Sequence, residues 1–145
     1  MRLALKTCIL IKMGTLSQKI VQLPIYFRKD IKMLLREFVD NYYLHDSFFE
    51  KISYDEQRQS VELTINFAFW MQSDYKISDP ETGIIKVIFN DVTEFVCSDD
   101  IDINAVSILK TDLYNNTVKF LIMNDITDNS LEMYITASSV NVIKT

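Results

Sequence analysis

Tyr42-Tyr43-Leu44-His45-Asp46-Ser47-Phe48-Phe49 is the stretch at which the chain changes its hydrophobic period. Before it, apolar residues recur every three or four positions, which is the spacing of one helix face. After it, apolar and polar residues alternate, as they do in a strand with one buried face. The same stretch contains the only histidine of the chain. It therefore predicts the boundary between a helix and a β-rich body and holds the first candidate for a functional side chain.

The helical pattern predicts one amphipathic helix over residues 27–43. The residues of its apolar stripe follow the spacing i, i+4, i+7, i+8, i+11 and i+15, and they are Phe27, Ile31, Leu34, Leu35, Phe38 and Tyr42. Residues 1–26 show no clear period. We expect them to form a poorly ordered lead-in or a short helix.

Period-two alternation predicts the β-rich body, residues 46–143. Phe48, Ile52 and Tyr54 are expected on one face of a first strand, and residues 61–69, which continue into Trp70, form the clearest second strand. A third strand is predicted over residues 84–95. Asn115-Asn116 predicts a hairpin turn between two further strands. The alternating apolar residues change from odd to even positions after residue 136, which predicts a break near Ala137-Ser138-Ser139.

The expected fold is therefore an α+β single domain, residues 1–145, with one main N-terminal helix. The helix would pack on a mostly antiparallel meander of six or seven strands, either strongly twisted or closed toward a barrel. Short polar turns leave no room for helical crossovers, so parallel pairing is not expected. A chain of 145 residues with 48% hydrophobic residues is long enough to bury a stable core.

Two groups of residues are candidates for a catalytic or metal site, but neither matches a known catalytic or metal-binding motif. His45 beside Asp46 is half of several general-base arrangements, but the alternative is that either side chain satisfies backbone groups where the helix stops. Asp100, Asp102 and Asn104 start a calcium-loop pattern that then fails at Ala105. No nucleophile is marked by a glycine-rich turn. We expect no catalytic residue, no metal site and no cofactor.

The cysteines and the N-terminus favour the cytoplasm. Cys8 and Cys97 lack metal-ligand spacing, and two free thiols in a reducing compartment are expected, with a disulfide between them as the alternative. No apolar stretch reaches the length of a membrane span, and charged residues interrupt the apolar N-terminal run. Cytoplasmic localisation is the prediction.

Charge is distributed unevenly and suggests the kind of partner. Residues 1–36 carry eight basic side chains against one acid, whereas the remainder carries seven against nineteen. An acidic body repels nucleic acid and attracts basic proteins, although acidity can also serve solubility alone. Aromatic residues at Trp70, Tyr75 and the pair Tyr42-Tyr43 are candidate contact residues or core residues.

Leu44-His45-Asp46-Ser47, ahead of an aromatic strand and an alternating hairpin, resembles small bacterial proteins of uncharacterised or immunity type. These proteins carry a leucine-histidine-aspartate motif before a β-rich body. The resemblance implies binding and neutralisation of a toxin without catalysis, and it points to His45 and Asp46.

Our first hypothesis is therefore a non-enzymatic acidic module that binds a protein with a basic surface, with no nucleic acid or membrane partner. Its candidate contact residues are His45, Asp46, Trp70, Tyr75, Asp99, Asp100 and Asp102. The alternative is a small-molecule-binding or hydrolytic domain with a pocket near His45 and Asp46. A third hypothesis is a homo-oligomer formed through an exposed edge strand such as residues 131–135.

Overall fold

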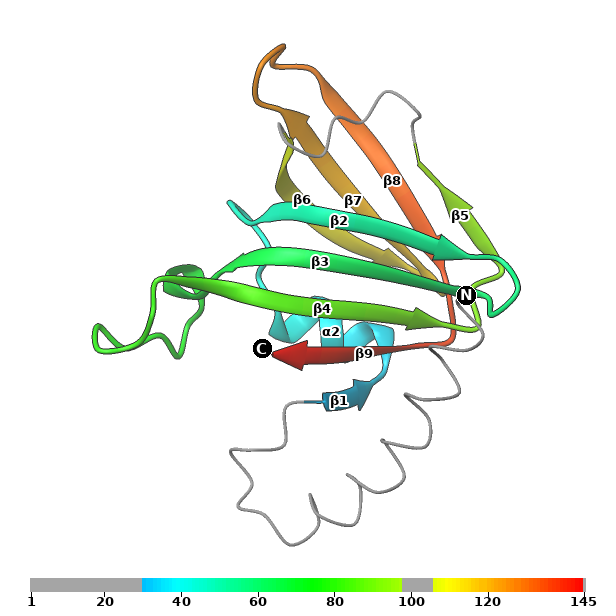
Figure 1. The fold of residues 1–145 in the computed structure, drawn as a ribbon, viewed down its shortest axis with the longest axis horizontal. Coiled ribbons are helices and arrows are strands. Elements are labelled where there is room, and N and C mark those ends of the chain that lie inside the picture. Colours follow the sequence, from blue (N-terminus) through cyan, green and yellow to red (C-terminus); the bar gives the residue numbers. More distant parts are fainter. Residues whose placement is uncertain (1–29, 98–105, 145) are drawn as a thin grey trace, which may run out of the picture.

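The computed structural model describes residues 30–97 and 106–144, and its main feature is one large antiparallel sheet (Figure 1). The described residues contain one α-helix, α2 (Leu35–Asn41), and one short 3-10 helix, η2 (Phe69–Met71). They contain nine strands: β1 (Asp30–Met33), β2 (Phe48–Asp55), β3 (Ser60–Ala68), β4 (Thr82–Asn90), β5 (Glu94–Val96), β6 (Val106–Tyr114), β7 (Thr117–Asn124), β8 (Ser130–Thr136) and β9 (Ser139–Lys144).

The strand order is β1-β9-β4-β3-β2-β6-β7-β8-β5, and every neighbouring pair is antiparallel. The absence of parallel pairs follows from the short connections, as predicted. The sheet remains open, with β1 and β5 at its edges, so closure toward a barrel, one of the two predicted shapes, is wrong. The predicted α+β class is also wrong, because the described chain is mostly β with one helix of seven residues.

The N-terminal helix is much shorter than predicted, because part of its apolar stripe forms a strand. Asp30–Met33 pairs with β9, with Ile31 opposite Val142 and Met33 opposite Val140. Ile31 and Met33 alternate with polar residues, so the four residues of β1 fit a strand as well as a helix. Pairing with β1 also gives β9 a hydrogen-bonded neighbour on its second side. Residues 27–29 and the predicted lead-in lie outside the described residues.

Both predicted hairpins are present. β2 pairs with β3 over residues 48–55 and 60–66, and β6 pairs with β7 around Asn115 and Asn116. Asn115 has a φ of 54°, the left-handed conformation that asparagine tolerates better than most residues. The predicted strand over residues 84–95 is instead two strands. β4 ends at Asn90, and Asp91 turns the chain with a φ of 51° toward β5.

Two chain crossings meet at one corner of the sheet. After β4 the chain leaves for β5 at the far edge, and the Thr93 N–H donates to the Thr136 carbonyl at 2.9 Å. After β8 it returns to β9, and the Ser138 N–H donates to the Asn90 carbonyl at 3.0 Å. The predicted break near Ala137-Ser138-Ser139 is this second crossing. Such crossings require the two ends of the sheet to bend toward each other.

The core fills the concave side of this bent sheet. The Phe89 ring of β4 meets the Phe120 ring of β7 edge-on at 6.3 Å, although three strands separate β4 from β7 in the sheet. Phe38 of α2 contacts Phe89 edge-on at 5.8 Å. Figure 1 shows α2 on this side, behind β4 and β9. Burial of Leu35 and Phe38 against the strands therefore fixes α2 and the segment that follows it.

Candidate functional site

Residues 42–47 lie where the two halves of the sheet join, and backbone hydrogen bonds hold them there. The Asp46 N–H donates to the Ile108 carbonyl at 3.0 Å, and the Ile108 N–H donates to the Ser47 carbonyl at 2.8 Å. β2 and β6 share only the pair Phe48–Ser107 in register. The segment before β2 therefore adds hydrogen bonds to a junction at which β2 and β6 share only one residue pair.

His45 is fixed by a β-bulge in β6. The pairing of β6 with β7 shifts between Ile108 and Lys110, which leaves Leu109 without a partner residue on β7. The His45 Nδ1 lies 2.9 Å from the Leu109 carbonyl oxygen. Because a carbonyl oxygen can only accept, Nδ1 carries the proton in this contact. His45 thus satisfies a backbone group, which was one of the two roles considered from the sequence.

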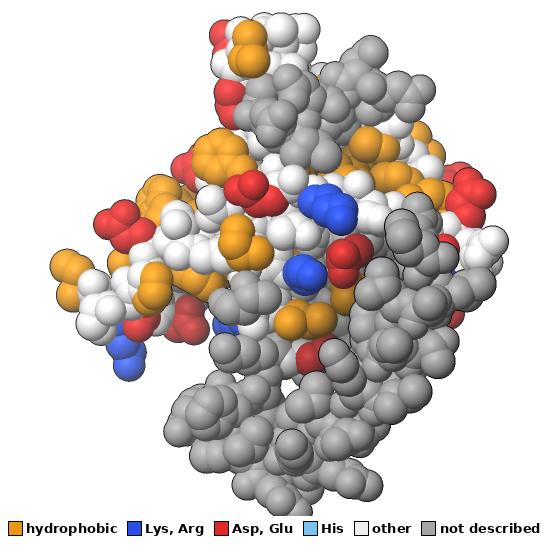
Figure 2. All heavy atoms as spheres, in the orientation of Figure 1, with side chains coloured by type: hydrophobic (Ala, Val, Ile, Leu, Met, Phe, Trp, Pro, Cys, Tyr) orange, Lys and Arg blue, Asp and Glu red, His pale blue; other side chains and the backbone are white. Residues whose placement is uncertain are grey.

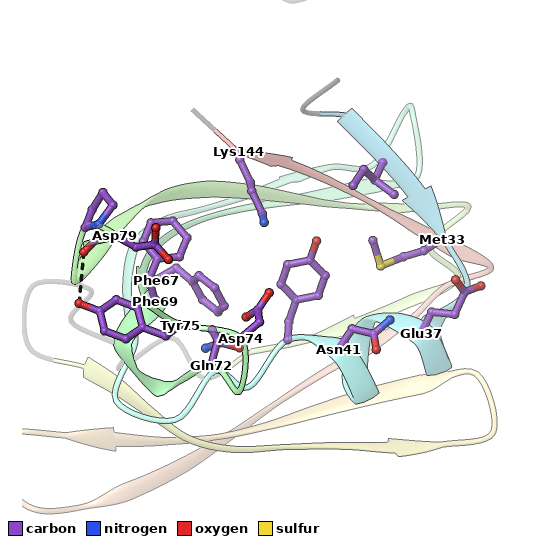
Figure 3. Close-up of a pocket in the computed structure, with 13 residues that line it drawn as sticks. Met33, Glu37, Asn41, Phe67, Phe69, Gln72, Asp74, Tyr75, Asp79 and Lys144 are labelled. Atoms are coloured by element: carbon purple, nitrogen blue, oxygen red, sulfur yellow. Dashed lines mark hydrogen bonds between the residues drawn. The ribbon is translucent and has the colours of Figure 1, made fainter. Parts of the chain in front are cut away.

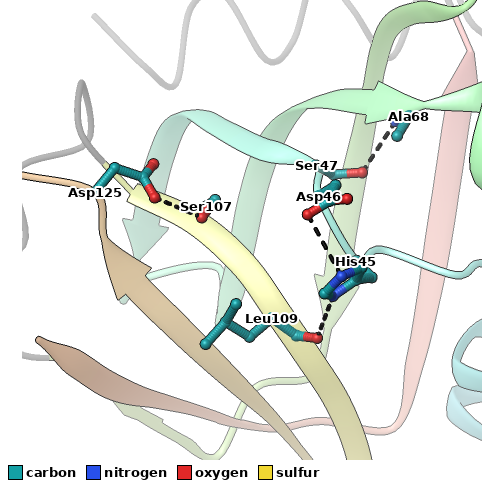
Figure 4. A network of polar contacts seen from close by, with 7 residues as sticks. All are labelled: His45, Asp46, Ser47, Ala68, Ser107, Leu109 and Asp125. Atoms are coloured by element: carbon teal, nitrogen blue, oxygen red, sulfur yellow. Dashed lines mark hydrogen bonds and ion pairs between the residues drawn. The ribbon is translucent and has the colours of Figure 1, made fainter. Parts of the chain in front are cut away.

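The other ring nitrogen of His45 faces Asp46. Its Nε2 lies 3.4 Å from the Asp46 Oδ1, and the Tyr43 ring stacks on the imidazole at 5.8 Å between centroids. Neighbouring side chains of a strand point to opposite faces, so contact between His45 and Asp46 was not expected from the sequence. They meet because Asp46 has a φ of 64° and the chain turns instead of extending. Figure 4 shows the imidazole between the Asp46 carboxylate and the Leu109 carbonyl.

Ser47 and Gln72 tie this segment to the end of β3. Ser47 is fully buried, and its Oγ accepts a hydrogen bond from the Ala68 N–H at 3.0 Å (Figure 4). The Gln72 amide donates to the carbonyls of Tyr43, at 2.7 Å, and Ala68, at 2.9 Å, and accepts from the Tyr43 N–H at 3.1 Å. The position of η2, between Ala68 and Gln72, is therefore set by the same contacts that set His45 and Asp46.

A groove of about 420 Å³ lies over this junction, and we call it the acidic–aromatic groove. Its lining residues come from the turn before β2, from β2, β3, β4 and β6, from η2 and from the turn after β7: Asp46, Phe48, Asn66, Trp70, Thr82, Ser107 and Asp125. Phe48 and Trp70 are each 47% exposed, which is high for such large apolar side chains. Among the described residues, two carboxylates and no basic side chain line the groove.

Phe48 reaches the groove because of a second bulge. The register of β2 with β3 shifts between Phe49 and Lys51, so Phe49, Ile52 and Tyr54 point toward the core. The expectation that Phe48 shares a face with Ile52 and Tyr54 is therefore wrong. Trp70 is likewise not the next residue of a strand, because β3 ends at Ala68 and η2 directs Trp70 outward.

Asp125 joins the groove from the turn after β7. Its Oδ1 accepts a hydrogen bond from the Ser107 Oγ at 3.0 Å, so the carboxylate has a fixed position beside β6 (Figure 4). Sequence reasoning missed Phe48 and Asp125 as site residues. The signal for Asp125 was weak, because a turn aspartate is usually a turn former and only the β6–β7 pairing brings it beside Ser107.

The other sequence candidates lie elsewhere. Tyr75 lines a separate cavity near α2, and His45 lines a neighbouring pocket of about 440 Å³ with Tyr43 and Leu44. Asp99, Asp100 and Asp102 lie outside the described residues. Cys8, the possible partner of Cys97, also lies outside them. The structure thus brings Asp46 and Trp70 together and separates Tyr75 from both.

Charge on the described residues is negative overall but mixed in its distribution. Residues 30–97 and 106–144 carry seventeen acidic and nine basic side chains. Figure 2 shows acidic, basic and hydrophobic side chains interspersed on the face it presents. The lack of basic side chains among the described residues of the groove is therefore a local property, not a consequence of a uniformly negative surface.

Among residues 30–97 and 106–144, no group of three or more histidine, cysteine, aspartate or glutamate side chains is arranged to hold a metal ion. The helices of the same part of the chain are too short or too polar to cross a bilayer. β8 is paired with β7 along its length and with β5 at Tyr134–Thr136, so residues 131–135 are a partly covered edge.

Comparison with protein-family models, with curated proteins and with solved structures found no match to this chain.

Proposed function

We propose that this protein is a non-enzymatic binding module that recognises a basic segment of a protein partner through the acidic–aromatic groove. The observation that carries the proposal is the pairing of two half-exposed aromatic rings, Phe48 and Trp70, with two carboxylates, Asp46 and Asp125. Aromatic side chains supply contact area at interfaces, and carboxylates attract and orient a basic partner.

The fixed geometry of the groove supports this role. Asp46 is positioned by its positive φ and by the hydrogen bond from its N–H to the Ile108 carbonyl, and Asp125 is positioned by Ser107. Ordered contact groups lose less conformational entropy when a partner binds, which favours affinity. In this proposal His45 is a positioning residue, because its bond to the Leu109 carbonyl holds the segment that carries Asp46 against β6.

The narrower proposal is an immunity-type protein of a bacterial cytoplasm that neutralises a toxin. It rests on the resemblance of residues 44–47 and on the acidic body. The hydrolytic alternative gains no comparable support, because the pocket beside the His45 ring is mostly apolar and no serine or cysteine is among the described residues that line it.

Trp70 is the only tryptophan of the chain, so its fluorescence reports directly on the groove. The protein is titrated with octalysine, and octaglutamate serves as the control for ligand charge. The test variant is Asp46→Asn with Asp125→Asn, which removes two charges but keeps the shape of each side chain. Asparagine also tolerates the positive φ of Asp46.

A matched control variant is Asp55→Asn with Asp91→Asn. It changes net charge equally, and Asp91 also has a positive φ, but both residues lie at the opposite ends of β2 and β4. We expect the groove variant to weaken octalysine binding about fivefold and the control variant less than twofold. Equal weakening by both variants would mean that only overall charge matters and would contradict the proposal.

The toxin hypothesis needs a protein partner. If a toxin is encoded beside the gene for this chain, co-expression with the wild-type protein should restore growth. Asp46→Asn with Asp125→Asn should restore less growth than the control variant. Restoration by neither the wild type nor the control variant would reject neutralisation of that toxin.

A further inference from the structure

A second and larger cavity lies between α2, β1, η2 and the loop of residues 72–80, and its volume is about 610 Å³. This volume is typical of sites for small organic molecules. Figure 3 shows side chains from these elements around one space, with Lys144 entering from one side and Asp74 from another. We call it the aromatic cavity.

One wall of the aromatic cavity is a row of three rings. Phe67 and Phe69 contact edge-on with centroids 5.3 Å apart, and Tyr42 lies 5.9 Å from Phe67. Tyr75 faces the cavity from the loop, where its hydroxyl donates to the Asp79 carbonyl at 3.2 Å. Burial raises the pKa of Tyr42, so its hydroxyl stays neutral near pH 7.

The charges around these rings favour a cation. Among the described residues, Glu37, Asp74 and Asp79 line the cavity against a single basic side chain, Lys144. The Lys144 Nζ lies 6.0 Å from the centroid of the Tyr42 ring, so the wall already accommodates one ammonium group. The Asp74 carboxylate has no hydrogen bond or ion pair within residues 30–97 and 106–144, which leaves it available to a ligand.

We propose that the aromatic cavity binds a small organic amine, a cation with an apolar body. The apolar body would contact the Phe67 and Phe69 rings, and the ammonium group would lie against Asp74 and the faces of the tyrosine rings. This site is separate from the acidic–aromatic groove. η2 lies between them, because Phe69 lines the cavity whereas Trp70 lines the groove.

Three probes of similar size separate charge from apolar contact. 2-Phenylethylammonium carries the proposed cation, 2-phenylethanol is neutral, and 3-phenylpropionate places a negative charge on the same ring and linker. Binding of each to the full chain is measured by isothermal titration calorimetry. We expect the ammonium probe to bind about tenfold more tightly than the alcohol and the carboxylate to bind most weakly. Equal affinities, or no heat from the ammonium probe at millimolar concentration, would overturn the proposal.

Two variants locate the binding site and have opposite expected effects. Asp74→Asn should weaken binding of the ammonium probe about threefold, because it removes the unpaired carboxylate. Lys144→Gln should strengthen it about twofold, because a competing cation leaves the wall. Asp91→Asn, at the far end of β4, is the control and should change nothing. Weakening by Lys144→Gln, or an effect of Asp91→Asn equal to that of Asp74→Asn, would contradict binding in this cavity.

Discussion

The His45 Nδ1 donates to the carbonyl oxygen of Leu109, which is the bulge residue of a strand sixty-four positions further along the chain. Bulges leave a backbone group without its ladder partner, and here a side chain supplies the missing donor. The contact joins the segment before β2 to β6, where the two strands share a single residue pair in register.

His45→Ala should therefore reduce stability. Losing one hydrogen bond that is half-exposed costs about 1 kcal/mol in the free energy of unfolding. His45→Asn is the matched variant, because its amide can donate from nearly the position of Nδ1, and it should lose less. Urea denaturation measures both. If the alanine variant unfolds at the wild-type urea concentration, the contact does not stabilise the junction.

Thr111 gives a prediction of the opposite sign. Its Oγ1 is buried and has no hydrogen-bond partner among the described residues, and its cross-strand neighbour is the core residue Phe120. Thr111→Val removes the unsatisfied hydroxyl at nearly the same volume, so stability should rise by about 1 kcal/mol. Thr64→Val, on the outward face of β3, makes the same chemical change and should alter the urea midpoint little. Equal effects would assign the gain to strand propensity.

Local patterns predicted the strands that alternate over many residues, and they failed where one residue changes the register. The run from Val61 to Phe67 predicted β3 because alternation of apolar and polar residues over this length fits a strand and not a helix. The bulges at Glu50 and Leu109 each add a single residue that no composition rule marks. The bulge at Glu50 places Phe48 in the groove instead of the core. Four residues of β1 were too few to separate a strand from a helix.

Contacts between distant segments were not predictable from the sequence alone. Asp46 and Trp70 were both candidates, but their shared groove depends on a positive φ at Asp46 and on η2. The pairing of β5 with β8 and of β9 with β4 depends on which edges remain open after the hairpins form. Those edges belong to the assembled sheet, so no single stretch of residues encodes them.

The Phe69 ring lies directly over Gly83 of β4, one of two glycines in the chain. A Cβ at this position would overlap the ring, although its φ is not positive and alanine fits the backbone. Gly83→Ala should therefore destabilise the protein by about 1 kcal/mol through overpacking. In a Phe69→Leu background the overlap is removed, and the same substitution should stabilise by about 0.5 kcal/mol because alanine is the better strand residue. Chemical denaturation of the four proteins tests the reversal of sign. The same change in stability in both backgrounds would exclude the ring as the cause.

Lys119, Glu132 and Tyr134 form a polar cluster on the outward face of β7 and β8, and it predicts a pH dependence. The Tyr134 hydroxyl donates a hydrogen bond to the Glu132 carboxylate, and the Lys119 Nζ donates to its Oε2 at 2.9 Å. These two bonds, the first more than the second, lower the pKa of the Glu132 carboxyl below its ordinary 4.5. A carboxyl whose pKa is lowered by folding adds stability above pH 4.5, and this stability is lost as pH falls through the folded-state value. The difference in melting temperature between the wild type and Glu132→Gln should therefore be largest near neutral pH and should shrink below pH 4.5. Calorimetry measures the melting temperatures, with Glu62→Gln, on β3, as the control for the loss of one carboxylate elsewhere on the sheet. A difference that is constant from pH 7 to pH 3 would mean that the carboxylate charge does not contribute.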